Sequence, residues 1–513
     1  MGLLDRLAQR FGYARPAHVP GPGTRAMHAA MLRAFQAAKV DRLTTGFSTA
    51  SSSINRDLVN GLETLRTRSR ELAQNNDYAK KFLQLVTTNV VGPNGFALQM
   101  QCRFANGDLD ASANAAIERA WYDWCRRGVC DVSGRMSFVD VQQLAIETAA
   151  RDGEYLVRRV WSRDVNRYGF ALQVLEVDRL DVKHNEVLAN GNRVIMGVEI
   201  ASTGAPVAYY LQTGAHPADA AYVTRARPER VPAEDIYHGF RSSRPEQVRG
   251  FPWTHTAMLR LHNLGAYEEA AVIAARVGAA KMGWIVSPDG TLEGLGDDKD
   301  QQGNVYTDVQ AGVIGMLPPG YDFKSFDPDY PHAAYGPFTQ AALRGISSGL
   351  GVAYHSLAND LTAVNYSSMR GGTLDERDNW STLQGWFSGS FLYPVFADWL
   401  RASLLQGAIT LRSGSPLPLE KYGYFNQPLF IGRRWSWVDP KNDLEAMEIA
   451  IRNRLKSRRQ IMAEQGLDLE DTWDQIAAEQ ALAATLDLDL PDDVQPAAAP
   501  AGDSNGLSEN PAA

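Results

Sequence analysis

Ser347 stands in the pentapeptide GISSG (345–349), which has the G-x-S-x-G spacing that many hydrolases use to expose a nucleophilic serine. That arrangement needs a strand before the serine and a helix after it. The helical spacing of Phe338 and Ile346 instead predicts a helix before Ser347 and a polar loop after it. His355 follows eight residues later on that loop, and nothing in the sequence places it as the base. We therefore expect no serine nucleophile at this position.

The remaining patterns give no catalytic or metal-binding site. The chain has neither the G-x-x-x-x-G-K-[ST] of a phosphate-binding loop nor the H-E-x-x-H of a zinc site. Its three cysteines, Cys102, Cys125 and Cys130, are an odd number in 513 residues, which indicates a reducing compartment and no disulfide framework. No histidine lies near Cys125 and Cys130, so we expect them to be small buried side chains. The sequence predicts no enzymatic activity, no metal and no cofactor.

Charge is distributed unevenly along the chain, whose formal net charge is −8. Residues 1–50 carry seven Lys or Arg against two Asp, whereas residues 464–513 carry twelve Asp or Glu and no Lys or Arg. The net charge therefore indicates no broad basic surface for nucleic acid. The most apolar long run, residues 270–286, is interrupted by Arg276 and Lys281, and the N-terminal sequence does not resemble a secretory leader. We expect a protein without a membrane segment.

The first half of the chain has the pattern of helices followed by strands. Residues 54–88 have helical periodicity, and VVGPNG ends it. Two further helices are predicted at 113–125 and 137–153. β-forming residues then fill YLVRRVW, FALQVLEV and RVIMGVEI, and STGAP (202–206) is expected to turn the last of these back into VAYYLQ. Residues 50–250 therefore predict an α+β domain.

The next part alternates helices with polar insertions. A long helix is predicted over 254–282, and its alanine-rich second half permits close packing against neighbouring helices. Residues 283–331 hold eight acids against two lysines and predict short strands at 305–316 and 321–326. Helical spacing returns over 333–349.

The segment NDLTAVNYSSMRGG, residues 359–372, is predicted to be a polar loop. In the TLDE that follows, Thr373 and Glu376 have the spacing of a capping box, which predicts that a helix starts there. A kink is expected at Pro394. The apolar face of this long helix consists of Trp380, Leu383, Phe387, Phe391, Val395 and Trp399.

Two helices are predicted near the C-terminal end. Asp439 and Pro440 form a typical helix start, and a further helix covers about 469–486. The first of them is expected to bury Leu444, Met447, Ile451 and Leu455. Beyond Asp487 the composition predicts disorder.

This order of parts resembles the portal proteins of tailed bacteriophages, specifically the lambda-like family. The resemblance covers about residues 50–480. Its most specific stretches are YEEAAVIAARVGAAKMGWIVSPDG, LPPGYDFKSFDPDYPH and GLGVAYHSLANDLTAVNYSSMRGGTLDERDNW. It implies a dodecameric ring at one capsid vertex, through which double-stranded DNA enters and leaves.

The resemblance also implies an α+β portal fold with named parts. These are a basic N-terminal arm at 1–49, an α+β wing at 50–253, a stem helix at 254–282, a β-containing clip at 283–331, a second stem helix at 332–349, a tunnel-loop region at 350–372, a wing helix and return at 373–438, crown helices at 439–487 and a disordered acidic tail at 488–513.

The same resemblance implies the site residues. The DNA-channel loop would use Asn365, Tyr366, Ser367, Ser368 and Arg370. The clip would bind partners through Asp297, Asp298, Asp308 and Asp322. Lys281 would either line the channel or pair with a carboxylate of a neighbouring subunit.

The implied partners are further copies of this chain, the large terminase subunit, a head-tail adaptor, the major capsid and scaffold proteins, and double-stranded DNA bound without sequence specificity. The implied location is the capsid vertex of the virion, and the host cytoplasm during assembly. A head-to-tail adaptor ring or a capsid-associated serine peptidase is the alternative. Adaptors are usually shorter and lack stem helices.

Overall fold

The computed structural model describes residues 42, 46, 48–212, 228–279, 283–286, 322–325, 334–362, 366–435, 440–464 and 469–486. The elements below all belong to the unit formed by residues 54–513.

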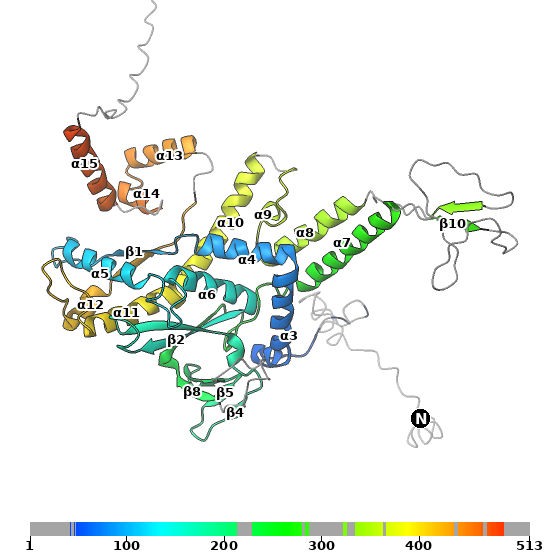
Figure 1. Cartoon of the computed structure of the whole chain (residues 1–513), viewed down its shortest axis with the longest axis horizontal. Helices are drawn as coiled ribbons and strands as arrows, with labels where there is room; N and C mark the ends of the chain where they lie inside the picture. The colour runs from blue at the N-terminus through cyan, green and yellow to red at the C-terminus, as the bar shows by residue number, and fades with distance from the viewer. Residues whose placement is uncertain are drawn as a thin grey trace, which may run out of the picture. The chain divides into compact units, whose positions relative to one another are not determined.

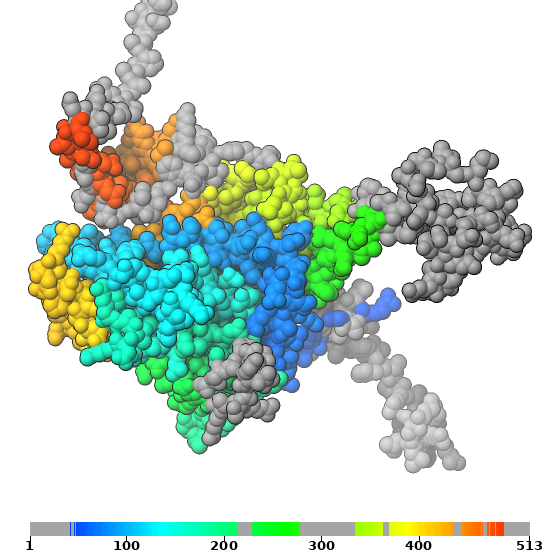
Figure 2. Space-filling model, in the orientation of Figure 1, coloured from blue at the N-terminus to red at the C-terminus, as the bar shows by residue number. Residues whose placement is uncertain are grey.

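Four helices precede the two larger sheets. They are α3 (Ile54–Asn75), α4 (Asp77–Val90), α5 (Ala111–Trp124) and α6 (Phe138–Asp152). The single helix predicted over 54–88 is divided at Asn76, whose side chain accepts a hydrogen bond from the Ala79 N–H at 3.0 Å and so caps α4. The predicted end of α6 at Gly153 is confirmed, with a left-handed φ of 97°. Side chains of α4, α5 and α6 form a continuous surface, coloured blue to cyan in Figure 2.

Two antiparallel sheets follow these helices. β2 (Glu154–Trp161) pairs with both β3 (Phe170–Leu175) and β9 (Ile236–Phe240), in the order β3-β2-β9. The second sheet has the order β4-β5-β6-β7-β8, with bounds Glu186–Val187, Arg193–Ile195, Val198–Ile200, Pro206–Leu211 and Glu229–Pro232. A separate two-stranded ladder joins β1 (Ala97–Met100) to β12 (Pro428–Ile431). The predicted α+β character is confirmed (Figure 1).

The predicted strand over 193–200 is wrong in one respect, because it is a hairpin. Met196 and Gly197 have φ values of 50° and 81° and form the two-residue turn between β5 and β6. Met196 adopts this unusual conformation while its side chain is fully buried against Leu58 and Leu62. Packing therefore offsets the strain at a position where Asn or Gly is usual. The predicted turn into the next strand is confirmed by the pairing of β6 with β7.

The remaining elements between residues 258 and 425 are mainly helical. They are α7 (Met258–Ala279), α8 (Tyr335–Leu350), α9 (Tyr354–Ala358), α10 (Tyr366–Phe387), a π-helical turn (Ser388–Leu392), α11 (Tyr393–Leu405) and α12 (Tyr422–Phe425). The π turn and the proline in the first turn of α11 together confirm an irregularity next to Pro394. Short 3-10 turns occur at Val177–Arg179, Ala233–Asp235 and Leu419–Lys421.

An aromatic core joins the two halves of the chain. All six residues of the predicted apolar face of α10 and α11 are buried. Trp399 of that face lies 5.0 Å from Trp121 of α5, and Phe391 lies 6.2 Å from Phe138 of α6, measured between ring centroids. Contacts between rings of this kind add to the stabilisation from apolar burial.

The C-terminal helices are α13 (Pro440–Arg452), α14 (Arg458–Glu464) and α15 (Leu469–Thr485). Helices starting at Pro440 and covering most of 469–486 are confirmed. The predicted burial is wrong for Leu444 and Leu455, which are 52 % and 76 % exposed in the single chain. Leu444 lies on a face of α13 that this chain alone does not cover, whereas Leu455 lies beyond the end of α13 at Arg452.

Candidate nucleic-acid interface

A helical hairpin formed by α7 and α8 leads to the predicted channel segment (Figure 1). The helices are antiparallel. Tyr267 lies 5.8 Å from Tyr335 and 4.8 Å from Phe338, between ring centroids, whereas eleven residues earlier the Thr256 hydroxyl donates a hydrogen bond to the Gly349 carbonyl at 2.8 Å. Both helices also bury apolar side chains in the core. These are Leu261 and Leu264 of α7, and Leu343 and Ile346 of α8.

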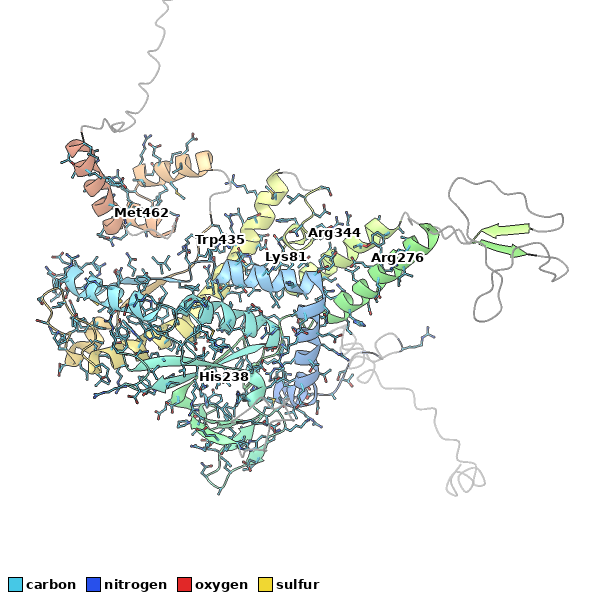
Figure 3. All side chains as sticks on the ribbon, in the orientation of Figure 1. Lys81, His238, Arg276, Arg344, Trp435 and Met462 are labelled. Carbon is cyan, nitrogen blue, oxygen red and sulfur yellow. The ribbon has the colours of Figure 1, made fainter. Side chains whose placement is uncertain are left out.

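Gly345 of α8 faces Arg260 of α7. A Cβ atom on Gly345 would lie 2.3 Å from Nη1 of Arg260, so a larger residue there would require this exposed guanidinium to move. Figure 3 shows Arg276 on α7 and Arg344 on α8, and both side chains are exposed. Large apolar side chains on α7 are exposed as well, including Leu259, Val272 and Ile273.

The two predicted strands next to the hairpin are partly described. β10 (Gly283–Val286) and β11 (Asp322–Ser325) pair antiparallel, which confirms a strand within 321–326. The strand predicted at 305–316 lies outside the described residues. So do Lys281, Asp297, Asp298 and Asp308, whereas Asp322 begins β11 but its side chain is outside the described part.

The start of the predicted channel loop is a fixed turn. α9 ends at Ala358, and the C-cap residue Asn359 has a left-handed φ of 53°. Asp360 then accepts hydrogen bonds from the Thr362 hydroxyl at 2.6 Å, the Thr362 N–H at 3.0 Å and the Tyr354 hydroxyl at 2.8 Å. These bonds, first of all those from Thr362, lower the pKa of Asp360 to about 2. Asp360 is therefore a stable anion at the entrance to the segment.

The predicted end of this loop is wrong. α10 begins at Tyr366, seven residues before the expected cap at Thr373. Glu376 does not complete a capping box, because its carboxylate accepts a hydrogen bond from the Ser356 hydroxyl of α9 at 2.7 Å. The helix continues through Gly371 and Gly372 in spite of the low helix propensity of glycine.

Most of the predicted DNA-contacting residues therefore lie at the start of a helix. Asn365 is outside the described residues. Tyr366, Ser367 and Ser368 form the first turn of α10, although their side chains are outside the described part. Arg370 follows one turn later and is half-buried. The structure thus brings four of the five residues onto one helical end.

Hydrogen bonds to neighbouring segments fix the C-terminal half of α10. The Gln384 side-chain amide donates hydrogen bonds to the carbonyls of Asn89 and Arg433, both at 3.0 Å. Trp435, labelled in Figure 3, donates from its indole N–H to Asn89 Oδ1 at 3.0 Å. The Arg377 guanidinium lies 5.8 Å from the centre of the Trp435 ring. α10 is therefore fixed to α4 and to the segment before the C-terminal helices.

The hydrolase arrangement around Ser347 is not formed. Ser347 lies within the last turn of α8 rather than after a strand, and it is 2 % exposed. Its Oγ has no hydrogen-bond partner among the described residues, so His355 does not act on it. Burial raises the pKa of the Cys102 and Cys130 thiols to about 12, as expected for buried side chains.

The described ranges hold neither a candidate metal site nor a candidate membrane span. They contain no group of three or more His, Cys, Asp or Glu side chains placed to hold a metal ion. None of their helices is both long and apolar enough to cross a bilayer.

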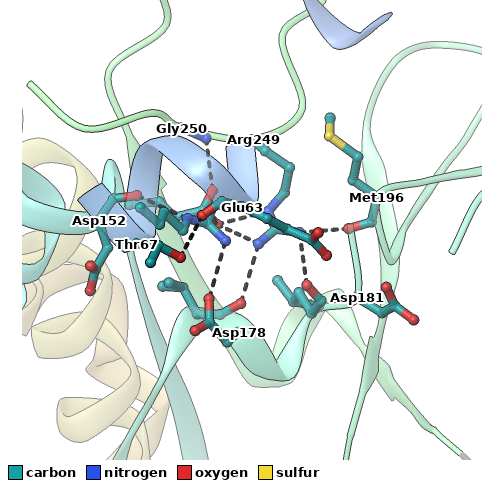
Figure 4. A network of polar contacts seen from close by, with 12 residues as sticks. Glu63, Thr67, Asp152, Asp178, Asp181, Met196, Arg249 and Gly250 are labelled. Carbon is teal, nitrogen blue, oxygen red and sulfur yellow. Dashed lines mark hydrogen bonds and ion pairs between the residues drawn. The ribbon is translucent and has the colours of Figure 1, made fainter. Parts of the chain in front are cut away.

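A buried ionic cluster lies between α3, the strands β2 and β9, and the segment before α7 (Figure 4). Glu154 is fully buried at the start of β2. Its Oε1 accepts hydrogen bonds from Arg66 at 2.5 Å and from Arg249 Nε at 2.7 Å. Its Oε2 accepts one from the Gly250 N–H at 2.7 Å and lies 3.0 Å from Nε2 of His238. One carboxylate thus joins four separate segments.

The two arginines extend this cluster into the backbone. Arg249 donates from Nη1 to the Met196 carbonyl at 2.6 Å and from Nη2 to the Val177 carbonyl at 3.3 Å. Arg66 donates from Nε to the Asp152 carbonyl at 3.1 Å. Because Arg249 lies nine residues before α7, the cluster fixes the chain that enters the hairpin.

Charge balance explains how these groups remain ionised. Burial alone would raise the pKa of Glu154, but Arg249 and Arg66, together with His238, outweigh it and hold that pKa well below its usual value. None of these residues was predicted from the sequence to belong to a functional site. One signal was present, because Arg66 continues the buried stripe of Leu58 and Leu62 on α3.

The sequence has clear relatives. The model of the family described as "Phage portal protein, lambda family" matches residues 40–384. The chain belongs to the lambda family of phage portal proteins. A "Probable portal protein" of Halomonas phage phiHAP-1 is 37 % identical over 489 residues, covering 93 % of this chain and 92 % of that protein. "Portal protein B" of Escherichia phage lambda is 22 % identical over 456 residues, covering 83 % and 85 %.

Solved structures with a similar chain come from gene transfer agent particles. One is the neck of an empty particle, with a TM-score of 0.43, 18 % identity and coverage of 79 % of this chain and 94 % of that chain. Another is the virion of a native particle, with a TM-score of 0.43, 17 % identity and coverage of 81 % and 99 %. The family membership rests on the sequence matches.

Proposed function

We propose that this portal protein forms a dodecameric ring at one vertex of a phage capsid, and that double-stranded DNA passes through the ring during packaging and ejection. Membership of the portal family over most of the chain carries this proposal. Exposed apolar side chains on α7 support it, since Leu259, Val272 and Ile273 are 68 %, 55 % and 51 % exposed in one chain. Neighbouring copies packed around a ring would cover such a surface.

The α7–α8 hairpin is the proposed stem, and the segment from 350 to 372 is the proposed channel loop. In this segment, the first turns of α10 would present Tyr366, Ser367, Ser368 and Arg370 to the DNA. Asn365 would lie just before them, between the turn at Asp360 and α10. Neutral polar groups exchange hydrogen bonds with phosphates and water readily, and one arginine per chain adds little lasting attraction. Lys281 would line the same channel or pair with a carboxylate of a neighbouring subunit.

The ring as a whole would let DNA slide. A dodecamer of chains with net charge −8 carries about −96, whereas tight binding requires many neutralised phosphates.

The remaining parts keep the proposed assignments of arm (1–49), wing (50–253 and 373–438), clip (283–331), crown (439–487) and tail (488–513).

The proposed partners follow from these parts. The clip would dock the large terminase subunit during packaging and the head-tail adaptor afterwards, and the wing would contact the major capsid and scaffold proteins. The protein would act in the host cytoplasm during assembly and at the capsid vertex of the virion. We propose a structural role without enzymatic activity.

Neutralising the clip should abolish motor docking without preventing ring assembly. Changing Asp297, Asp298 and Asp308 to asparagine removes the acidic groups proposed to contact the motor. We expect at least a tenfold loss of the large terminase subunit in a pull-down. The measurement compares bound motor per ring, with ring mass checked in the same sample.

A matched control removes three exposed carboxylates from the α+β part, as Glu63→Gln, Asp164→Asn and Glu186→Gln. This control should retain motor binding. Unchanged docking in the clip variant would refute the assignment of residues 283–331 as the motor-binding part.

A further inference from the structure

The connection between α13 and α14 carries a concentrated positive charge. Residues 452–459, RNRLKSRR, contain five cations and no acid, in a chain whose net charge is −8. All eight residues are exposed. The cations are Arg452, Arg454, Lys456, Arg458 and Arg459. We call residues 452–459 the basic turn.

Three of these cations have local partners on the surface. Arg452 contacts Glu448 at 2.5 Å, Lys456 contacts Glu464 at 2.8 Å, and Arg459 contacts Glu470. Such exposed pairs contribute little to stability and can be exchanged for other anions. The side chains of Arg454 and Arg458 make neither a hydrogen bond nor an ion pair with any residue in the described ranges.

Folding does not explain these two arginines. The N–H of Leu455 donates to the Ala450 carbonyl at 2.9 Å, and that of Arg454 donates to the Ile451 carbonyl at 3.0 Å. This geometry ends α13 with Arg454 in the left-handed region, at a φ of 57°. Glycine is favoured there, so an arginine makes the helix end less stable.

Arg458 is also placed against local preference. It is the first residue of α14, where the partial positive charge of the helix N-terminus disfavours a cation. Both arginines therefore weaken the elements that carry them, and both leave a guanidinium exposed to solvent. A role in binding an external anion accounts for both features.

We propose that the basic turn binds the phosphate backbone of double-stranded DNA. The inference rests on the proposed function for the presence of the duplex, and it adds a contact separate from the channel loop. Guanidinium groups bind phosphate oxygens through paired hydrogen bonds. Contacts confined to phosphates carry no sequence information, so binding at this site is independent of sequence.

The test uses the full-length assembled ring and a fluorescently labelled 30-base-pair duplex. Binding is followed by anisotropy between about 50 and 200 mM salt, the range in which phosphate contacts are strongly screened. In the double variant Arg454→Gly/Arg458→Ala we expect at least fivefold weaker binding. The slope of log K against log salt should become shallower by about 2, because each phosphate contact contributes about 0.9.

The same variant separates binding from stability. Glycine suits the left-handed position, so its midpoint of thermal unfolding should be equal to or higher than that of the unaltered protein. Arg454→Lys should retain most of the binding because it keeps the charge. The matched control Arg163→Ala/Arg412→Ala removes two exposed arginines of the α+β part and should bind DNA as the unaltered ring does.

Three results would overturn the proposal. One is unchanged affinity and salt slope in the double variant, and another is an equal loss in the control. A third is dissociation of the variant ring in native mass spectrometry. That result would show that the cations form ion pairs with the acidic α15 of a neighbouring copy instead of binding DNA. Failure of the proposed function is distinguishable, since the unaltered chain would then form no ring.

Discussion

Replacing Glu154 with glutamine should lower the free energy of unfolding by about 3–5 kcal/mol, because it removes the charge that compensates two buried arginines. Arg249 and Arg66 are 0 % and 2 % exposed, so solvent cannot take over that role. Urea unfolding followed by tryptophan fluorescence measures the loss, since Trp121, Trp124 and Trp399 lie in the adjoining core.

Glu229→Gln is the matched control. Glu229 pairs with Arg158 on the surface at 3.1 Å, with side chains 45 % and 33 % exposed. Its removal should cost about 0–1 kcal/mol. Equal effects of the two changes would show that the buried cluster does not hold the sheet of β2 and β9 to the segment that enters α7.

The effect of Glu154→Gln should also depend on pH. The pKa of Glu154 in the folded protein lies well below its ordinary value of 4.5. Its stabilising contribution is therefore fully present above pH 4.5 and is lost as the pH falls towards the folded-state pKa. Glutamine does not titrate, so the difference in stability between the two proteins should narrow in acid. A difference that stays constant from pH 7 to pH 3 would contradict the assigned ionisation.

Altering the channel segment should leave the ring intact but impair its handling of DNA. Because α10 begins at Tyr366, the change is best confined to residues 361–365, replaced by five Gly or Ser residues, together with Arg370→Ala. The buried residues of α10 from Trp380 onward are untouched, so stability should change little. We expect at least a tenfold fall in the fraction of heads that hold a full-length genome. Arg370→Ala alone should have a smaller effect.

Genome length in purified heads measures this outcome. The matched control replaces the exposed turn at residues 189–191 with Gly or Ser, which changes a loop of the five-stranded sheet. Heads built with the control should package normally. Full-length, stably held DNA in heads carrying the channel variant would show that this segment has no part in the channel.

The sequence predicted the main elements because their signals are local. Periodic apolar residues identified α10 and α11 as one buried face, and a helix-ending glycine located the end of α6. The hairpin between β5 and β6 was missed for a physical reason. Met196 has no turn propensity, and its conformation is tolerated because its side chain packs against α3.

Non-local contacts decided the features that the sequence did not reveal. The capping box predicted from Thr373 and Glu376 does not form, because the Ser356 hydroxyl of α9 donates a hydrogen bond to the Glu376 carboxylate. The ionic cluster joins Arg66 and Arg249 to a glutamate 88 and 95 positions away, and no local rule pairs such residues. Buried charges in particular depend on partners that only the fold brings together.

The mass of the purified, assembled protein tests the central proposal most directly. A dodecamer of 56.4 kDa chains has a mass of about 680 kDa. Native mass spectrometry in moderate salt should therefore show one closed assembly near that value, because the exposed apolar residues of α7 need neighbours on both sides. A stable species at 56.4 kDa under the same conditions would contradict the account.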